Sequence, residues 1–574
     1  MKKTRRQFLT DSASLSGGLF LSKNASLDEV LKSVSAQHPD RPNIILMLAD
    51  DMGFSDIGCY GSEIPTPHLD RLAGEGLRFT QFYNNPRCCP SRASLMTGLY
   101  PHQAGFGLMT ADYNKYPNAG LAYQGDLSDH CVTIAEVLRT AGYKTAMCGK
   151  WHLTPPEGVD KHNWPLQRGF DKFYGIIAGA ANYYNPETLT RDNTPIRAEG
   201  ENYYFTDALG ENAVQYIGDF AKSSSPFFLY TAFTASHWPL HAPEATIARH
   251  IERYRSGWDT LRAERHARQI KMGIVEESWG LSPRDPRVPS WELAAHKEWE
   301  IRRMAVYAAI IDHMDQAVGR IMKAVDDAGV ADKTLILFMA DNGGNYEEVN
   351  PVPPNAKRQL WFPEKTRDGQ PVVMGNKPNL MPGPETTYQS YGMGWGNGSN
   401  TPFRLYKHYA HEGGISTPLI AHWPSVIKQH NRITKQVGHE TDIMATCLEL
   451  AGVSYPTATA ANLTPPLAGK SLLSVFQGGE RTRAPIFWEH EGNCAMRDGK
   501  WKLVSQWPDV WELYDMEKDR TEMHNLADAH PEIVKSMGKA YAAWAKQVGV
   551  LPWPLPGGKT VEITAPKYLR DMDD

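Results

Sequence analysis

The feature that most constrains the fold is a set of continuous apolar runs of strand length. Three of them occupy residues 43–49, 227–234 and 334–340, and a shorter one occupies 418–422. A strand that is covered on both faces has this pattern, whereas a strand with one wet face alternates between apolar and polar residues. The runs therefore predict an α/β fold with a large, mostly parallel sheet. At 574 residues, the chain is long enough for more than one domain.

Polar side chains follow these runs at the points where the strands end. Asp50 and Asp51 follow the first run, Asp341 and Asn342 follow 334–340, and His237 comes soon after 227–234. Open α/β sheets bind ligands beyond the carboxyl ends of their strands. Three carboxylates and one amide oxygen form an all-oxygen set that suits Ca²⁺ or Mg²⁺ better than Zn²⁺. The alternative is a pair of solvated turns, because Asp and Asn are common turn residues.

Composition argues against several classes of function. The net charge is −5, with 60 Lys and Arg against 65 Asp and Glu, and no basic stretch indicates a general nucleic-acid binder. The seven Cys are scattered and odd in number, which is not typical of a disulfide framework. Beyond the N-terminal segment no run of 18 apolar residues occurs, so we expect no membrane span.

Residues 88–98 place a thiol, a proline and an arginine at the start of a predicted helix. Pro90 suits the first helical position, and Leu95 and Met96 begin an apolar face. A helix N-terminus offers free N–H groups and the positive end of the helix dipole to an anion. Taken alone, Cys88 would more commonly be explained as a buried structural cysteine.

The full string from 88 to 98 matches the pattern C-x-P-S-R-x-x-x-x-T-G and so resembles the signature of the sulfatase family. In that family an enzyme oxidises the first Cys of the signature to formylglycine. The resemblance therefore implies formylglycine at Cys88 and a sulfatase-maturing partner, while Cys89 occupies a free position of the pattern. It also implies that Asp50, Asp51, Asp341 and Asn342 bind Ca²⁺ together with residue 88.

Three further segments carry the resemblance. The Gly-Lys-Trp-His-Leu string at 149–153 is similar to a second family signature, and its Lys150 and His152 would share one face of an extended segment. Lys407, followed five residues later by Glu-Gly-Gly, matches a third signature. The Ser-His-x-Pro string identifies His237 as the family's histidine, and His241 is interpreted as a structural or pocket-wall residue.

The resemblance implies an arylsulfatase-like sulfuric ester hydrolase, which cleaves sulfate monoesters to an alcohol or phenol and inorganic sulfate. One hydroxyl of the formylglycine hydrate would attack sulfur, and the other would drive release of sulfate. His152 would be the base for that release, and His237 and Lys407 would contact the sulfate and assist the leaving oxygen. Arg92 and Lys150 would hold the hydrate, and cationic groups of this kind can neutralise the sulfate oxygens.

Three alternatives remain open. A phosphodiester or phosphonate monoester hydrolase of the same superfamily would share the metal ligands. A glycan sulfatase could use the many Trp and Tyr residues near 361–395 to stack on sugar rings. A catalytically inactive ligand-binding protein is the alternative from another class.

The long insertion from 343 to 406 is predicted to form a wall of the pocket, with flexibility from its Gly-rich part at 392–400.

The predicted organisation has four parts, and the resemblance implies an alkaline-phosphatase-like fold. Residues 1–38 form an export segment with paired Arg5 and Arg6 that resembles a twin-arginine signal, the alternative being a basic tail. This predicts a periplasmic or secreted protein. Residues 39–484 form the catalytic domain, with helices predicted at 297–330 and 441–452. Residues 485–554 form a small antiparallel sheet with one helix at 531–549, and 555–574 form a tail.

Overall fold

The computed structural model describes residues 41–110, 116, 118–156, 160–352, 360–459 and 462–555. The predicted export segment lies outside these residues, as does all but the first residue of the predicted tail. Among the described helices, none combines the length and the apolar character that crossing a membrane requires.

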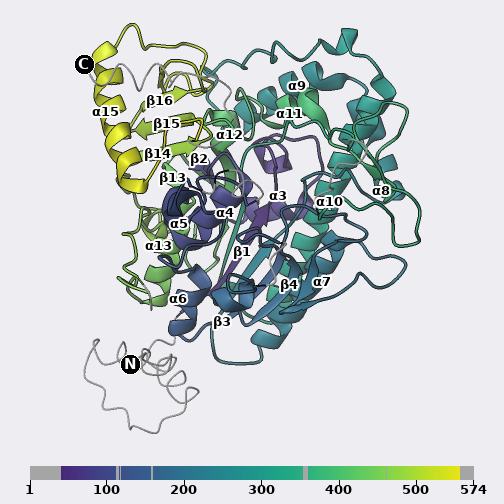
Figure 1. Cartoon of the computed structure of the whole chain (residues 1–574), viewed down its shortest axis with the longest axis horizontal. Coiled ribbons are helices and arrows are strands. Elements are labelled where there is room, and N and C mark those ends of the chain that lie inside the picture. Colours follow the sequence, from purple (N-terminus) through teal and green to yellow (C-terminus); the bar gives the residue numbers. More distant parts are fainter. Residues whose placement is uncertain are drawn as a thin grey trace.

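A mixed, mostly parallel sheet of 11 strands forms the centre of the molecule, as predicted (Figure 1). The strand order is β12-β2-β11-β8-β1-β7-β3-β4-β5-β6, and β13 pairs with β2. Strands β8, β1, β7, β3 and β4 run parallel, and β11 runs antiparallel between β8 and β2. The bounds are β1 Asn43–Ala49, β2 Leu77–Tyr83, β3 Lys144–Lys150, β4 Lys172–Ile176, β5 Leu189–Arg191, β6 Thr194–Pro195, β7 Phe227–Ala232, β8 Thr334–Ala340, β11 Ser416–His422, β12 Arg432–Thr434 and β13 Gly438–His439.

Helices cover both faces of this sheet. The α-helices are α3 Pro67–Gly74, α4 Cys88–Thr97, α5 Pro101–Ala104, α6 Ile134–Thr140, α7 Phe205–Phe220, α8 Glu244–Ala248, α9 Gly257–Met272, α10 Lys297–Asp327, α11 Gly392–Ser399, α12 Glu412–Ile415, α13 Thr441–Ala451, α14 Leu473–Phe476 and α15 Pro531–Val548. The 3₁₀ helices are η1 Gly58–Tyr60, η3 Leu121–Tyr123, η4 Pro165–Arg168, η5 Ile251–Tyr254, η6 Trp291–Leu293 and η7 Ala331–Lys333, and a two-strand ladder joins β9 Val373–Met374 to β10 Thr387–Tyr388.

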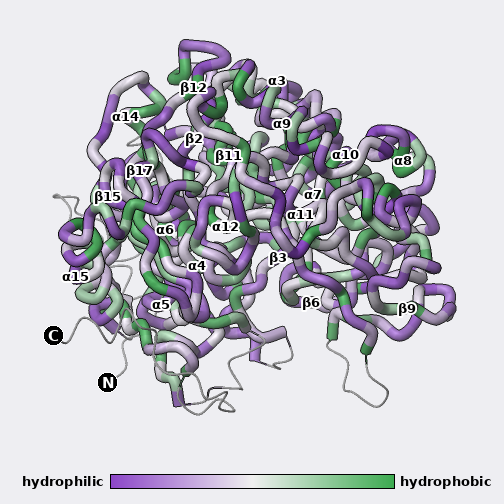
Figure 2. Tube along the Cα trace, turned by 90° about the horizontal axis from the view of Figure 1, so that it is seen from above, coloured by the Kyte–Doolittle hydropathy of each residue, from purple (hydrophilic) through white to green (hydrophobic). Residues whose placement is uncertain are grey.

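The alternation of side chains along β1 explains why its whole sequence is apolar. Ile45 and Met47 belong to the core shared with α7 and α10, whereas Ile44 and Leu46 belong to the core shared with α4, α6 and α13. Successive strand residues point to opposite faces, so a strand between two helical layers is apolar throughout. In Figure 2 hydrophobic segments lie near β11 in the interior, and many of the outer loops are hydrophilic.

The strand register brings the predicted polar residues to one edge of the sheet. Ala49 pairs with Ala340, and Gly149 pairs with Ala232, so β1, β8, β3 and β7 end at the same level. Strand β11 is antiparallel, and it therefore begins at the edge where its neighbours end. The segment before β11, which includes Lys407, consequently lies at this edge as well.

The C-terminal part forms a second, four-stranded antiparallel sheet with one helix, as predicted. Strands β14 Ile486–His490, β15 Asn493–Asp498, β16 Trp501–Ser505 and β17 Glu512–Asp515 follow one another in order, and α15 packs on β15 and β16 (Figure 1). Trp544 on α15 stacks on Phe487 of β14 with ring centroids 5.0 Å apart. The Asp498–Gly499 turn joins β15 to β16.

Two local predictions were wrong. Helix α4 begins at Cys88, because the N–H of Ser91 already donates to the carbonyl of Arg87 at 2.9 Å, and Pro90 is therefore its third residue. A proline in the first turn loses no helical hydrogen bond. The Gly-rich run is not a flexible loop but the buried helix α11. A Cβ on Gly396 would lie 2.3 Å from the carbonyl oxygen of Asn345, so this glycine permits close packing.

A buried charge cluster joins the two sheets. Glu412 on α12 contacts Lys502 of β16 at 2.9 Å and Arg520 at 2.9 Å, and all three side chains are fully buried. Burial would raise the pKa of Glu412, but the charges of Lys502 and Arg520 lower it to about 2. Because Glu412 lies five residues after Lys407, this cluster also anchors the segment that brings Lys407 to the sheet edge.

We expect Lys502→Met to lower the free energy of unfolding by roughly 3–5 kcal/mol, because it leaves buried carboxylates without their partner. Lys500→Met on the same hairpin is the matched control, since the Lys500 side chain is 42% exposed, and should change stability by less than about 0.5 kcal/mol. The pKa of Glu412 is lower in the folded state, so its contribution is complete above pH 4.5 and decreases as the pH falls toward 2. Denaturant midpoints measured from pH 7 to pH 3 should fall less steeply for Glu412→Gln; equal slopes would contradict this assignment.

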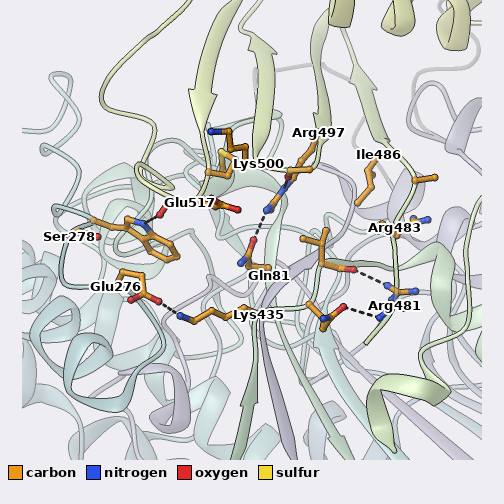
Figure 3. Close-up of a pocket in the computed structure, with 16 residues that line it drawn as sticks. Gln81, Glu276, Ser278, Lys435, Arg481, Arg483, Ile486, Arg497, Lys500 and Glu517 are labelled. Carbon is orange, nitrogen blue, oxygen red and sulfur yellow. Dashed lines mark hydrogen bonds and ion pairs between the residues drawn. The ribbon is translucent and has the colours of Figure 1, made fainter. Parts of the chain in front are cut away.

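A cavity of about 630 Å³ lies between the two sheets. Its basic side chains are already paired. Figure 3 shows Arg497 with Gln81, at 2.5 Å, and Lys435 with Glu276. Arg481 binds Asp442, at 2.5 Å, outside the residues drawn there. None of the predicted site residues lines this cavity.

Candidate active site

Cys88 lies in the first turn of α4 at the centre of the predicted site. Its side chain is buried, and burial raises the pKa of its thiol. The charges that act most strongly on that thiol are those of Lys150, Lys407, Asp51 and Asp341, which come from four separate segments. The structure therefore brings together groups that are as far apart in sequence as Asp51 and Lys407.

Asp50 and Asp341 form one half of the site with Arg92 and Lys150. The Nζ of Lys150 donates to both carboxylate oxygens of Asp50, at 3.0 and 2.7 Å. Arg92 binds Asp341 through Nε at 3.0 Å and Nη2 at 2.8 Å, and its Nη2 lies 3.4 Å from Asp50. Arg92 also donates to the Lys150 carbonyl at 2.9 Å. The guanidinium of Arg92, on α4, therefore connects the ends of β1, β8 and β3.

Asp51 forms the other half of the site with three side chains from separate segments. These are His237 after β7, Asn342 after β8 and Lys407 after the insertion. The Asp51 oxygens accept hydrogen bonds from Asn342 Nδ2 at 2.8 Å and from Lys407 Nζ at 2.8 Å. His237 Nε2 lies 3.4 Å from Asp51. Burial lowers the pKa of His237 to about 3, and the imidazole is therefore neutral at pH 7.

Burial and neighbouring charges shift the pKa values of the buried carboxylates. Burial and the neighbouring Asp50 raise the pKa of Asp341 to about 6. Burial would also raise the pKa of Asp51, but the positive charge of Lys407 holds it below its ordinary value. The three carboxylates are thus crowded in a buried environment, where a cation would stabilise their charged forms.

His152 lies at the site, but its backbone conformation differs from the predicted one. Strand β3 ends at Lys150, and His152 has φ +56°, so the two residues do not lie on one extended segment. The His152 ring is buried with its Nδ1 unpartnered, and burial, together with the charge of Lys150, holds its pKa well below the ordinary value. Gly179 makes room for it, since a Cβ there would lie 2.3 Å from His152 Nε2.

The structure adds residues that sequence reasoning missed. Asn345 Nδ2 donates to Asp51 at 2.8 Å, and Glu347 lies 3.7 Å from Lys407 and 2.7 Å from Arg87. Asn345 and Glu347 follow the Asp341–Gly344 turn closely, and this proximity was the available signal. His241, by contrast, is fully buried beside the Thr387 carbonyl at 2.6 Å, in agreement with its interpretation as structural.

The residues at this edge fit a hard divalent cation. Ligand atoms of Asp50, Asp51 and His237 lie within 4.8 Å of one another. Asn342 points its amide into the same group, and its Oδ1 is buried without a hydrogen-bond partner. An unpartnered buried carbonyl oxygen is costly, and a cation beside the carboxylates would satisfy it.

Residues 42–453 match the family described as Sulfatase, and residues 403–547 match the family described as N-sulphoglucosamine sulphohydrolase, C-terminal. The chain belongs to the sulfatase family. This membership places it in the alkaline phosphatase-like superfamily and makes it a sulfuric ester hydrolase by class.

Several curated sulfatases are similar over most of their length. An uncharacterized sulfatase of Schizosaccharomyces pombe is 31% identical over 90% of this chain and 95% of its own. An arylsulfatase of Klebsiella aerogenes is 32% identical, covering 78% and 95%. The N-acetylgalactosamine-6-sulfatase of Canis lupus familiaris is 28% identical, covering 84% and 75%.

The fold of this sulfatase is also found among solved structures. The crystal structure of Ps i-CgsB superposes with a TM-score of 0.62 at 24% identity, over 90% of this chain and 94% of that chain. The similarity confirms the predicted fold class.

Proposed function

We propose that this sulfatase is an arylsulfatase-type enzyme that carries formylglycine at position 88 beside a bound Ca²⁺. The observation that carries the proposal is the meeting of Cys88, three carboxylates and three cationic side chains at one sheet edge. Ca²⁺ would be held by Asp50, Asp51, Asp341, Asn342 and residue 88. When present, the formylglycine hydrate supplies a hydroxyl nucleophile, and the cation lowers the cost of negative charge on the sulfate oxygens.

The charge balance of the site supports an anionic substrate. Asp50, Asp51 and Asp341 offset Lys150, Lys407 and Arg92, a set of three negative and three positive side chains. A divalent cation would therefore leave an excess of about two positive charges in a buried site. Such an excess favours a sulfate ester and opposes a neutral ester, because electrostatic interactions are strong where water is excluded.

The side chains have distinct proposed roles. Arg92 and Lys150 orient residue 88, Lys407 contacts the sulfate oxygens, and His237 assists the leaving oxygen. His152 accepts the proton that must be removed before sulfate is released; its neutral ring and its unpartnered Nδ1 support this role.

An apolar wall supports an aryl leaving group. Trp238 follows His237, with ring centroids 4.3 Å apart, and packs against Phe362 at 6.0 Å and Tyr388 at 5.9 Å. The predicted sugar-stacking role of the aromatic residues at 361–395 is not supported for Tyr388, Tyr391 and Trp395, which are buried. The glycan alternative rests instead on the similarity to an N-acetylgalactosamine-6-sulfatase.

A parallel assay distinguishes these substrates. The protein, produced together with a formylglycine-generating enzyme, would be given an aryl sulfate, a 6-sulfated N-acetylgalactosamine and a phosphodiester of the same phenol. We expect kcat/KM to be highest for the aryl sulfate. A higher value for the sugar would make it a glycan sulfatase, and a higher value for the phosphodiester would contradict the proposal.

The Gly179 position gives a test of the His152 assignment. Gly179→Ala should displace the imidazole while leaving the backbone intact, and we expect kcat to fall by roughly 10²-fold, as catalytic misplacements of about 1 Å do. Gly218→Ala on α7 is the matched control, because its Cβ would meet no atom within 4 Å. Circular dichroism and kcat would be measured for both variants; an unchanged kcat in Gly179→Ala would show that the ring position is unimportant.

A further inference from the structure

A second cluster of metal-binding side chains lies outside the site described above. Ligand atoms of His408, His490 and Glu491 lie within 4.8 Å of one another. His490 is the last residue of β14, Glu491 begins the turn to β15, and His408 directly follows Lys407. The cluster therefore connects the C-terminal sheet to the segment that carries Lys407.

His490 is the residue of this cluster whose ring nitrogens lack hydrogen-bond partners. Its side chain is 1% exposed, and neither Nδ1 nor Nε2 has a hydrogen-bond partner. Its ring lies edge-on to the His408 ring, with centroids 5.5 Å apart. A buried imidazole usually has at least one partner, because leaving it unpaired costs free energy.

The distances suit a small tetrahedral ion. Zinc–ligand bonds of about 2.0–2.2 Å place neighbouring tetrahedral ligand atoms about 3.3–3.5 Å apart. His408 Nδ1 already lies 3.4 Å from Glu491 Oε2, and His490 Nε2 lies 4.0 Å from Glu491 Oε1. The Glu491 side chain, which is 24% exposed, has room to rotate its Oε1 toward His490.

The donor set and the surrounding charge select the kind of ion. Two imidazoles and one carboxylate favour Zn²⁺ or a similar transition-metal ion over Ca²⁺, which prefers oxygen ligands. The nearby positive charge of Arg87 is matched by Glu347 at 2.7 Å. His408 and Glu491 keep 23% and 24% of their side chains exposed, so an ion in solution can reach the cluster.

We propose that His408, His490 and Glu491 form a binding site for a divalent transition-metal ion such as Zn²⁺, separate from the oxygen-rich edge at Asp50 and Asp51. An ion at this site would fasten the β14–β15 turn to the segment that carries Lys407. It would thereby stabilise the contact between the C-terminal sheet and the main sheet.

Co²⁺ is the probe for this site. The full protein would be saturated with Ca²⁺ to occupy the oxygen-rich edge and then titrated with Co²⁺. Four- or five-coordinate Co²⁺ with imidazole ligands absorbs visible light far more strongly than octahedral Co²⁺ with oxygen ligands. We expect one equivalent of the strongly absorbing form, its displacement by Zn²⁺, and a higher melting temperature with Zn²⁺ present.

Variants decide the assignment. His490→Phe keeps the ring shape without its nitrogens, and Glu491→Ala removes a carboxylate from a turn; each should weaken Co²⁺ binding by at least about tenfold. His430→Phe, at an exposed histidine outside the cluster, is the matched control and should bind as the parent does. If circular dichroism shows that His490→Phe is unfolded, Glu491→Ala decides alone. The absence of the strong band in the parent, or its persistence in Glu491→Ala, would overturn the proposal.

Discussion

Cys88→Ala is expected to lower kcat by at least about 10⁴-fold while leaving the fold intact, because it removes the precursor of the nucleophile. Cys88 is a small side chain in the first turn of α4, where alanine is an excellent helix former. Activity toward an aryl sulfate and thermal melting would be measured on the same preparation. Cys88→Ser should be almost inactive as well, unless the maturing enzyme accepts serine.

The adjacent cysteine provides the control for this experiment. Cys89 is also buried, lies in the same helical turn and contacts the Met109 sulfur at 3.3 Å, but it occupies a free position of the signature. Cys89→Ala should therefore keep most of the activity at a modest cost in stability. An active, well-folded Cys88→Ala protein, or equal losses for both variants, would refute the nucleophile assignment.

Removal of the divalent cation is expected to lower activity by at least about 10²-fold, with recovery on addition of Ca²⁺. The reason is the crowding of Asp50, Asp51 and Asp341, whose charges the cation offsets in a buried site. Ca²⁺ at 100 times its dissociation constant should also stabilise the protein by about 2.7 kcal/mol. Calorimetric titration and melting curves of chelator-treated protein measure both effects.

A ligand variant makes the cation test specific. Asp341→Asn removes one charge and weakens the contacts to Arg92, so we expect Ca²⁺ affinity to fall by at least about 10²-fold. Asp219→Asn on the outer face of α7 is the matched control, since that side chain is 54% exposed. Ca²⁺ binding of equal strength in both variants would contradict the proposed ligand set.

The sequence predicted the sheet well because its central strands are buried on both faces. The runs at 43–49 and 334–340 became β1 and β8 with the predicted bounds, and their register places Asp50 beside Asp341. The helix predicted at 297–330 was also confirmed as α10, and its apolar residues Met304, Ile311 and Val318 are fully buried. In each case the pattern follows from local periodicity and burial, and no distant contact decides it.

The rest depends on contacts between distant segments. The Gly-rich run at 392–400 has low helix propensity, yet it forms α11 because tertiary packing, including the approach of Gly396 to Asn345, overrides propensity. The position of the His152 side chain depends on the positive φ of that residue. The alternation of side chains along an extended strand cannot predict such a φ. Asn345 and Glu347 are identified only once the structure places them beside Asp51 and Lys407.

The most direct test of the central claim is mass spectrometry of the peptide that contains Cys88, taken from catalytically active protein and compared with its specific activity. We expect the residue to have lost sulfur and gained oxygen, to react with an aldehyde-specific hydrazide, and to be converted in proportion to activity across preparations. Full activity in a preparation where residue 88 remains entirely a thiol would contradict the account.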